Sequence, residues 1–298
     1  MFHDPVLLSE ILDLGKGAAR VVDGTLGDGG HAAAFIAEGA EVLGVDRDPE
    51  AIRRAAERVG SGRLTTVQGS FFDEPVLARV SQFRPDLVLL DLGVSSRQLD
   101  DDALGFSFRP GAVLDMRMSG VGSTAADILN EMPAEDLATV FADWGDERKA
   151  RPLAREIARR RSRAPMVVSD DLVNAIRSVL GPRSGPSDFA RIFQALRIAV
   201  NGELDGLAAA LPVFRDALVP DGRLLVISYH SGEDRIVKHA FQEWAKRCIC
   251  PPELPVCRCR GRALGTLDPR KPVRASGVEV NANPRARSAI LRGFRTAR

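Results

Sequence analysis

Residues 21–32, VVDGTLGDGGHA, decide the fold of this chain. An apolar run ends on Asp23, four glycines follow within seven residues, and a helix-compatible segment starts at His31. A strand, a glycine-rich turn and a helix in this order let the backbone approach a nucleotide-like ligand closely. We therefore expect a ligand site here. A turn whose glycines serve only tight packing is the alternative.

A second acid follows the next apolar run. Residues 42–45, VLGV, end on Asp46, about fifteen residues after the glycine-rich turn. An acid at this place can accept hydrogen bonds from the two ribose hydroxyls of an adenosine. The succession of strand, turn, helix, strand and acid indicates a cofactor site more strongly than the glycines do alone.

Further apolar runs predict a parallel sheet. Strands are expected at residues 64–68 and 86–91, and another at 223–228. Continuous apolar runs suit parallel strands covered on both faces, so we predict a doubly wound α/β fold. A ligand of such a sheet lies beyond the carboxyl ends of the strands. The side chains expected there are Asp23, Asp46, Phe71 and Asp91.

The sequence between residues 105 and 187 predicts an inserted helical subdomain. Helical patterns cover most of residues 125–180, which is more than one crossover between strands needs. The sheet domain is then made of residues 1–104 and 188–298. Two final strands are expected at residues 275–280 and 289–294.

The net charge of +1 hides an asymmetry. Residues 235–298 hold fifteen Lys or Arg against four Asp or Glu, a net +11, so the remaining chain sums to −10. A basic segment on an acidic body favours a polyanionic partner, and a solvated tail is the alternative.

The helix predicted near residues 147–163 carries eight Lys or Arg and is either solvated or meets phosphate. Its candidate phosphate contacts are Arg159, Arg160 and Arg161.

The composition favours a cytoplasmic globular protein. Of the 298 residues, 45% are hydrophobic, enough to bury a full core. Apolar runs all fall short of the roughly 20 residues that span a bilayer. The first residues have no basic region ahead of an apolar one, as a signal peptide would. We expect no membrane partner.

All four cysteines fall within twelve residues, as C-x-C-x6-C-x-C: Cys248, Cys250, Cys257 and Cys259. Four thiolates can form a metal site. However, C-x-C is tighter than the C-x2-C typical of zinc ribbons, and several prolines intervene. Disulfides are disfavoured in a reducing cytosol. The pattern therefore favours reduced structural cysteines without stoichiometric metal, with a metal site as the alternative.

Two ligands fit a doubly wound fold with an acid after its second strand: a dinucleotide and S-adenosylmethionine. The dinucleotide fingerprint is G-x-G-x-x-G, with the pyrophosphate at the helix N-terminus. This turn reads G-x-x-G-x-G-G and follows Asp23. A carboxylate there repels a pyrophosphate but accepts hydrogen bonds from an amino-acid ammonium group. The physical argument favours S-adenosylmethionine.

Eight stretches between His3 and Arg292 match a known family: HDPVLLSE, DGTLGDGGHA, GVDRDP, DLGVSSRQLD, GFSFRPGAVLDMRM, IFQALRIAVNGEL, SYHSGEDR and NPRARSAILR. By these motifs the chain closely resembles the bacterial 16S ribosomal RNA cytosine-N(4) methyltransferases of the RsmH (MraW) type. The match covers almost the whole chain.

The resemblance implies a Rossmann-like methyltransferase domain with an inserted helical domain that contacts RNA. The implied reaction moves a methyl group from S-adenosylmethionine to the exocyclic amine, N(4), of a cytidine in the decoding region. The partner is then small-subunit ribosomal RNA, either naked or in the assembled 30S subunit. The resemblance leaves open whether the protein is a monomer or a homodimer. The donor-site residues carried over from the family are Gly29, Gly30, His31, Asp46, Phe71, Asp91 and Gln98.

The sequence leaves the catalytic group open. The cytosine amine is a poor nucleophile because its lone pair is delocalised into the ring, so an acceptor for one amine hydrogen helps attack. Candidates for this acceptor are Asp91, Ser95, Tyr229 and His230. An unstacked target base needs an aromatic platform, for which Phe106, Phe108 and Tyr229 are candidates.

Two other classes of protein stay open. A non-catalytic RNA-binding protein can keep a degenerate nucleotide fold, and a titration with S-adenosylmethionine separates it from an enzyme. A nicotinamide oxidoreductase would change the fluorescence of its reduced cofactor on mixing.

Overall fold

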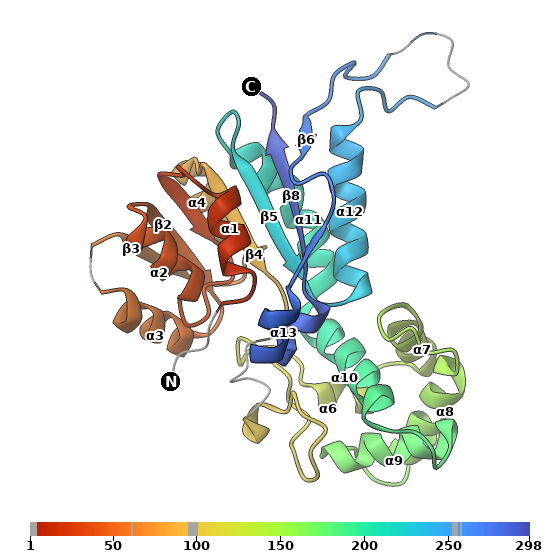
Figure 1. Cartoon of the computed structure of the whole chain (residues 1–298). Helices are drawn as coiled ribbons and strands as arrows, with labels where there is room; N and C mark the ends of the chain where they lie inside the picture. The colour runs from red at the N-terminus through yellow and green to blue at the C-terminus, as the bar shows by residue number, and fades with distance from the viewer. Residues whose placement is uncertain (1–4, 61, 95–100, 252–255, 257) are drawn as a thin grey trace. The chain divides into compact units, whose positions relative to one another are not determined.

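Two compact units make up the chain (Figure 1). The computed structural model describes residues 5–60, 62–94, 101–251, 256 and 258–298. The sheet unit joins Met1–Gly93 to Leu204–Arg298, and the helical unit is Val94–Glu203. The helical unit extends further at both ends than the predicted range 105–187. One reason is α10 (Pro186–Asn201), which buries its apolar face in the core of this unit.

Within the described residues, the sheet has eight strands in the order β3-β2-β1-β4-β5-β8-β6, with β7 beside β8. The strands β1 to β5 run parallel, and β8 is antiparallel to β5. The order reverses between β1 and β4, which is the switch point of a Rossmann-like sheet. The strands are β1 Arg20–Asp23, β2 Glu41–Asp46, β3 Leu64–Gln68, β4 Leu87–Asp91, β5 Arg223–Ser228, β6 Gly265–Leu267, β7 Val273–Arg274 and β8 Ile290–Thr296.

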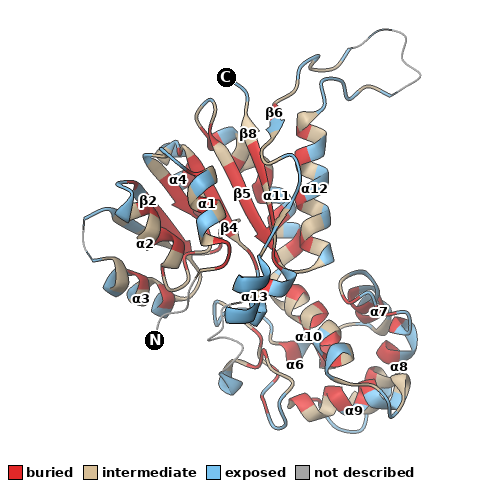
Figure 2. Cartoon of the chain, in the orientation of Figure 1, coloured by how far each residue is buried: buried red, intermediate tan, exposed pale blue. Residues whose placement is uncertain are grey.

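Apolar side chains cover both faces of this sheet, so its central strands are buried (Figure 2). Along β4, Leu87 and Leu89 face one core, and Val88 and Leu90 face the other. The first core is closed by α1 (Leu8–Leu14), α2 (Gly30–Ala37) and α3 (Pro49–Val59). The second is closed by α4 (Glu74–Phe83), α11 (Glu203–Ala217) and α12 (Ser231–Ala245). The two-faced burial explains the continuous apolar runs in the sequence.

The helical unit has its own apolar core, to which all five of its longer helices contribute. Besides α10 these are α6 (Ala125–Glu131), α7 (Ala134–Asp143), α8 (Ala150–Arg161) and α9 (Ser169–Leu180). A short 3-10 helix, η1 (Asp102–Leu104), precedes them. Across the described part of the chain, no helix is long and apolar enough to cross a membrane.

The C-terminal segment differs from its prediction. The strand expected at 289–294 is confirmed as β8, but the strand expected at 275–280 is wrong. A helix, α13 (Gly277–Ala282), forms there because the Ser276 hydroxyl accepts the Glu279 N–H at 3.1 Å and caps it. A 3-10 turn, η2 (Pro284–Ser288), then leads into β8.

Candidate active site

The acids that end β1, β2 and β4 meet at one edge of the sheet. These strands are parallel neighbours, and Asp23 lies in register with Gly44 of β2 and Leu89 of β4. The backbone N–H of Asp91 donates to the Thr25 hydroxyl oxygen at 2.7 Å, which ties β4 to the glycine-rich turn. An acid-lined edge therefore forms at the switch point, where ligands of such sheets bind.

Asp46 holds the glycine-rich turn in place. Its Oδ2 accepts the N–H of Gly27 at 2.7 Å, and its Oδ1 accepts the N–H of Asp48 at 2.9 Å. The N–H of Gly29 donates to the carbonyl oxygen of Leu26 at 2.8 Å. These amides of the turn already have partners within the fold, whereas a pyrophosphate site requires amides that point at the ligand. The geometry thus argues against a dinucleotide.

Packing explains part of the glycine pattern. Gly29 has φ 72°, and a Cβ there would lie 2.9 Å from the Cβ of Ala55. Gly30 begins α2, where a Cβ would lie 3.2 Å from Pro5. Larger residues at both positions would push α2 and its neighbours apart. The packing interpretation of these two glycines therefore holds, and the acids carry the argument for a ligand.

Asp91 is the centre of a polar cluster. The Tyr229 hydroxyl donates to Asp91 Oδ1 at 2.8 Å. His31 is buried, and its Nε2 lies 3.0 Å from the carbonyl oxygen of Val6. A carbonyl oxygen only accepts hydrogen bonds, so we assign the proton to Nε2. Nδ1 of His31 then lies 4.0 Å from Asp91 Oδ2.

Burial changes the pKa values of the groups in this cluster. It raises the pKa of Asp91 to about 7, although the hydrogen bond from Tyr229 lowers it. Burial raises the pKa of Asp23 to about 6, and nearby His31 opposes that rise. Burial also raises the pKa of the Tyr229 hydroxyl, which keeps its proton, and lowers the pKa of His31. Asp91 therefore titrates near neutral pH, as a proton acceptor in catalysis should.

His230 belongs to the start of α12. Its Nδ1 accepts the N–H of Glu233 at 3.4 Å as part of the helix cap. Its Nε2 lies 3.1 Å from Glu233 Oε1 but is not aligned for a hydrogen bond, and is unsatisfied among the described residues. The backbone N–H of Tyr229 also donates to Glu233, at 2.8 Å. The ring of His230 is committed to capping α12, so His230 is a weaker catalytic candidate than Asp91.

The remaining predicted residues fall in three groups. Phe71 packs edge-on against Phe72, with ring centroids 5.3 Å apart, at the end of β3. Phe106, predicted as a platform for the base, is buried instead in the core of the helical unit, whereas Phe108 is partly buried against that core and remains a prediction. Two predicted residues, Ser95 and Gln98, lie outside the described residues.

The three arginines predicted to contact RNA have partners inside the helical unit. Arg159 and Arg160 both pair with Glu156 at 2.7 Å. Arg161 donates to the carbonyl oxygens of Leu129 (2.9 Å) and Met132 (2.7 Å) at the end of α6. Their replacement would disturb the fold as well as any RNA contact.

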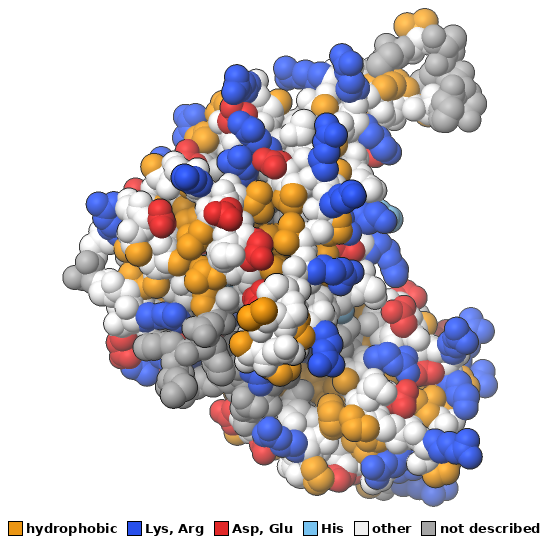
Figure 3. Space-filling model, in the orientation of Figure 1, with side chains coloured by type: hydrophobic (Ala, Val, Ile, Leu, Met, Phe, Trp, Pro, Cys, Tyr) orange, Lys and Arg blue, Asp and Glu red, His pale blue; other side chains and the backbone are white. Residues whose placement is uncertain are grey.

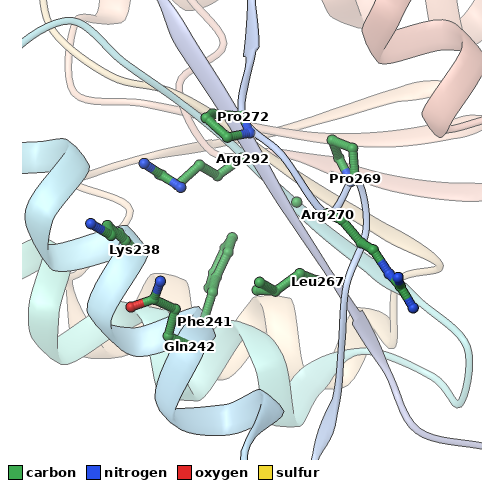
Figure 4. A pocket seen from close by; sticks show the side chains of 9 residues that line it. Lys238, Phe241, Gln242, Leu267, Pro269, Arg270, Pro272 and Arg292 are labelled. Atoms are coloured by element: carbon green, nitrogen blue, oxygen red, sulfur yellow. The ribbon is translucent and has the colours of Figure 1, made fainter.

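A separate pocket lies on the sheet unit between α12 and the β6–β8 segment (Figure 4). Gly293, one of its lining residues, is paired with Leu225 in the middle of β5, away from the strand ends. Arg292 in this pocket pairs with Asp234 at 2.7 Å. We place the ligand site at the strand ends because the acids and the shifted pKa values gather there.

Sequence reasoning gave no role to three groups in the site. These are the Thr25 hydroxyl, the Val6 carbonyl oxygen and the buried carboxylate of Glu233. Glu233 carries a signal in the sequence, because an acid three residues after a cap position is a helix-start pattern. The other two depend on tertiary contacts and have no local signal.

Asp23→Asn is expected to stabilise the protein at pH 8. Asp23 is 1% exposed, and its folded pKa lies above its ordinary value, so the folded state binds this proton more tightly than the unfolded state does. The wild type therefore loses stability as pH rises from about 4 to about 6, and the variant does not. A shift of about two units corresponds to on the order of 3 kcal/mol. Thermal melts of both proteins at pH 5 and pH 8 measure the difference. A lower melting temperature for the variant at pH 8 would contradict this account.

The strand order and the acid-lined strand ends define the chain as a Rossmann-like methyltransferase. The chain belongs to the MraW methylase family, which matches residues 1–297.

Curated relatives align over nearly their full length. One, from Gemmatimonas aurantiaca, is 53% identical over 99% of this chain and 96% of its own, and is named ribosomal RNA small subunit methyltransferase H. A relative of the same name from Rubrobacter xylanophilus is 46% identical over 99% of this chain and 96% of its own. Among solved structures, an rRNA methylase from Streptococcus thermophilus is similar at 11% identity and a TM-score of 0.44, covering 100% of this chain and 99% of that one.

Proposed function

We propose that this protein transfers a methyl group from S-adenosylmethionine to the exocyclic amine, N(4), of a cytidine in the decoding region of small-subunit ribosomal RNA. The observation that carries the proposal is the Asp91 carboxylate, with a pKa near 7, held by Tyr229 at the strand-end edge. Membership of the MraW methylase family and the names of the relatives support the substrate class. A cytoplasmic location follows from such a substrate.

The acids fit the donor better than they fit a phosphate-bearing cofactor. The Asp46 carboxylate accepts backbone N–H groups and, with about four acceptor sites on its two oxygens, retains capacity for a ribose hydroxyl. Asp23 and Asp91 supply negative charge for the ammonium group and the sulfonium of S-adenosylmethionine. The side chain of Phe71, at the end of β3, offers an apolar surface beside this edge.

Asp91 is assigned as the acceptor for the target amine. S-adenosylmethionine supplies an already activated methyl group, so the protein mainly positions the two reactants in line. A hydrogen bond from the amine to Asp91 would draw its lone pair out of conjugation and take up the proton after transfer. Tyr229 stays protonated, so it orients Asp91 by donating to it. Among the aromatic candidates, Tyr229 also remains available as a platform for the unstacked base.

RNA contacts are assigned to exposed cations on both units, where Lys and Arg side chains are frequent (Figure 3). In the sheet unit, η2 carries exposed Arg287 just before β8, whose first residue pairs with the last residue of β5. This places Arg287 near the strand-end edge. In the helical unit, exposed Arg151 and Arg155 lie four residues apart on one ridge of α8.

Replacing Arg151 and Arg155 together with alanine is expected to weaken RNA binding. Each phosphate contact contributes about 0.7–0.9 to the slope of log affinity against log salt, so the slope should fall by about 1.5. Binding of the methyl donor should not change. Filter binding to small-subunit ribosomal RNA across a salt series measures the slope. The pair Lys16→Ala and Arg79→Ala, exposed cations of the sheet unit, is the matched control for lost charge. Equal slopes for the wild type and the α8 variant would show that this ridge does not contact RNA.

The proposed reaction is tested on RNA from cells that lack the protein. Mass mapping of their small-subunit RNA should show one cytidine without its N(4) methyl group. Purified protein with labelled S-adenosylmethionine should restore that methyl group. Naked RNA and 30S subunits, supplied in parallel, identify the substrate form. Unchanged methylation in the cells, or labelling at another atom, would reject the assignment.

A further inference from the structure

Three cysteine thiols meet in the loop that follows α12. The sulfur atoms of Cys248, Cys250 and Cys259 all lie within 4.8 Å of one another. Cys248 and Cys259 are eleven residues apart in sequence, yet their sulfur atoms are 3.8 Å apart. Zinc–sulfur bonds of about 2.3 Å in a tetrahedral site separate the sulfur atoms by about 3.8 Å. The distance between Cys248 and Cys259 therefore equals that of two thiolates on one metal ion, and Cys250 lies close enough to join them.

Backbone N–H groups contact two of the sulfur atoms. The backbone N–H of Ile249 donates to Cys259 Sγ, and that of Arg258 donates to Cys250 Sγ, each at 3.3 Å. Such hydrogen bonds hold the orientation of the two sulfur atoms. The thiolate is the form of cysteine that binds metals.

The loop is fixed at its base, and the residues of it that the structure describes have little apolar packing. The Arg260 guanidinium donates to the carbonyl oxygens of Trp244 (3.3 Å) and Lys246 (2.9 Å) at the end of α12. Beyond this anchor, Ile249 is 43% exposed and Val256 is 66% exposed. The described residues of this loop thus bring thiols together while burying few apolar side chains. In segments of this kind a bound metal can supply the folding energy.

We propose that Cys248, Cys250 and Cys259 bind one thiophilic divalent metal ion, zinc in the cell, and that the metal holds this loop. Each thiol releases a proton on binding, and the three sulfur atoms become ligands. Cys257 lies outside the described residues, and the proposal does not depend on it. The sequence spacing alone favoured reduced cysteines without metal. The convergence of the sulfur atoms is the reason for the opposite proposal.

Elemental analysis of the full-length, tag-free protein tests the site. We expect about one zinc per chain in protein prepared under reducing conditions. Cys248→Ser and Cys259→Ser should each lower this content at least fivefold. Val256→Ser changes an exposed residue of the same loop without removing sulfur, and should retain the metal. Equal zinc content in all four proteins would overturn the proposal.

A cobalt titration of the metal-stripped, reduced wild type gives a second measurement that needs no variant. Cobalt bound by thiolates produces an intense near-ultraviolet absorption, which should saturate at about one ion per chain and disappear when zinc is added. Absence of a saturable signal would overturn the proposal. So would a Cys248–Cys259 disulfide in the freshly purified protein together with no metal uptake after reduction.

Discussion

Asp91→Asn is expected to slow methyl transfer at least a hundredfold while the protein stays folded. The amide oxygen of asparagine can still accept the Tyr229 hydroxyl, so the geometry of the cluster is retained. The variant loses the negative charge and the ability to take a proton, and a positioned acceptor typically contributes about 100- to 10,000-fold. Single-turnover rates with saturating donor and 30S subunits measure the loss. Calorimetry with S-adenosylmethionine shows whether donor binding is kept within tenfold. A rate within threefold of the wild type would exclude Asp91 as the acceptor.

The pH dependence separates the role of Asp91 from that of Tyr229. Because the ionised carboxylate is the active form, the wild-type rate should rise with pH and level off above about 7. The hydrogen bond from Tyr229 lowers the pKa of Asp91, so Tyr229→Phe should move this rise to higher pH. Asp91→Asn should have no such rise. A Tyr229→Phe profile that moves to lower pH would show that Tyr229 acts in another way.

The strand-end edge was predictable because its signals are local. Strands buried on both faces are continuous apolar runs, and each of β1, β2 and β4 ends on an acid in the sequence. Parallel strands bring their carboxyl ends to one edge, so Asp23, Asp46 and Asp91 had to meet if the strands were neighbours. The pattern of residues thus determined this part of the site without knowledge of distant contacts.

The contact between Tyr229 and Asp91 was not predictable from local patterns. The two residues are 138 positions apart, and their meeting depends on the pairing of β4 with β5 across the whole helical unit. The same limit explains the error at Phe106. Its stretch is rich in glycine and proline and resembles an exposed loop, while the ring of Phe106 is buried by helices that follow much later.

The convergence of the cysteine thiols could not be predicted, for a different reason. The spacing of the cysteines differs from that of known zinc ribbons, and spacing was the only information in the sequence. Cys259 lies beside Cys248 although they are eleven residues apart in sequence, which a comparison of motifs does not detect. Short strands such as β7 were missed because two residues are too few to show an alternation of apolar and polar side chains.

Asp46→Ala is expected to weaken the binding of S-adenosylmethionine at least tenfold. The two ribose hydroxyls lose a charged acceptor, and hydrogen bonds to charged groups contribute roughly 1.5–3 kcal/mol. The substitution also removes the acceptor of the Gly27 N–H, so part of the loss can come from a looser turn. Calorimetry measures the Kd, and a melting curve reports the loosening.

Asp48→Ala is the matched control for a loss of stability next to Asp46. Asp48 caps α3 by accepting the N–H of Glu50 at 2.9 Å, and it lies two residues after Asp46. Its loss should lower the melting temperature, because an N-cap contributes about 1 kcal/mol, and should change donor affinity less than threefold. If both variants weaken donor binding to the same degree, the loss at Asp46 reflects a general loss of stability. If only Asp46→Ala does so, the loss comes from the site that Asp46 forms with the glycine-rich turn.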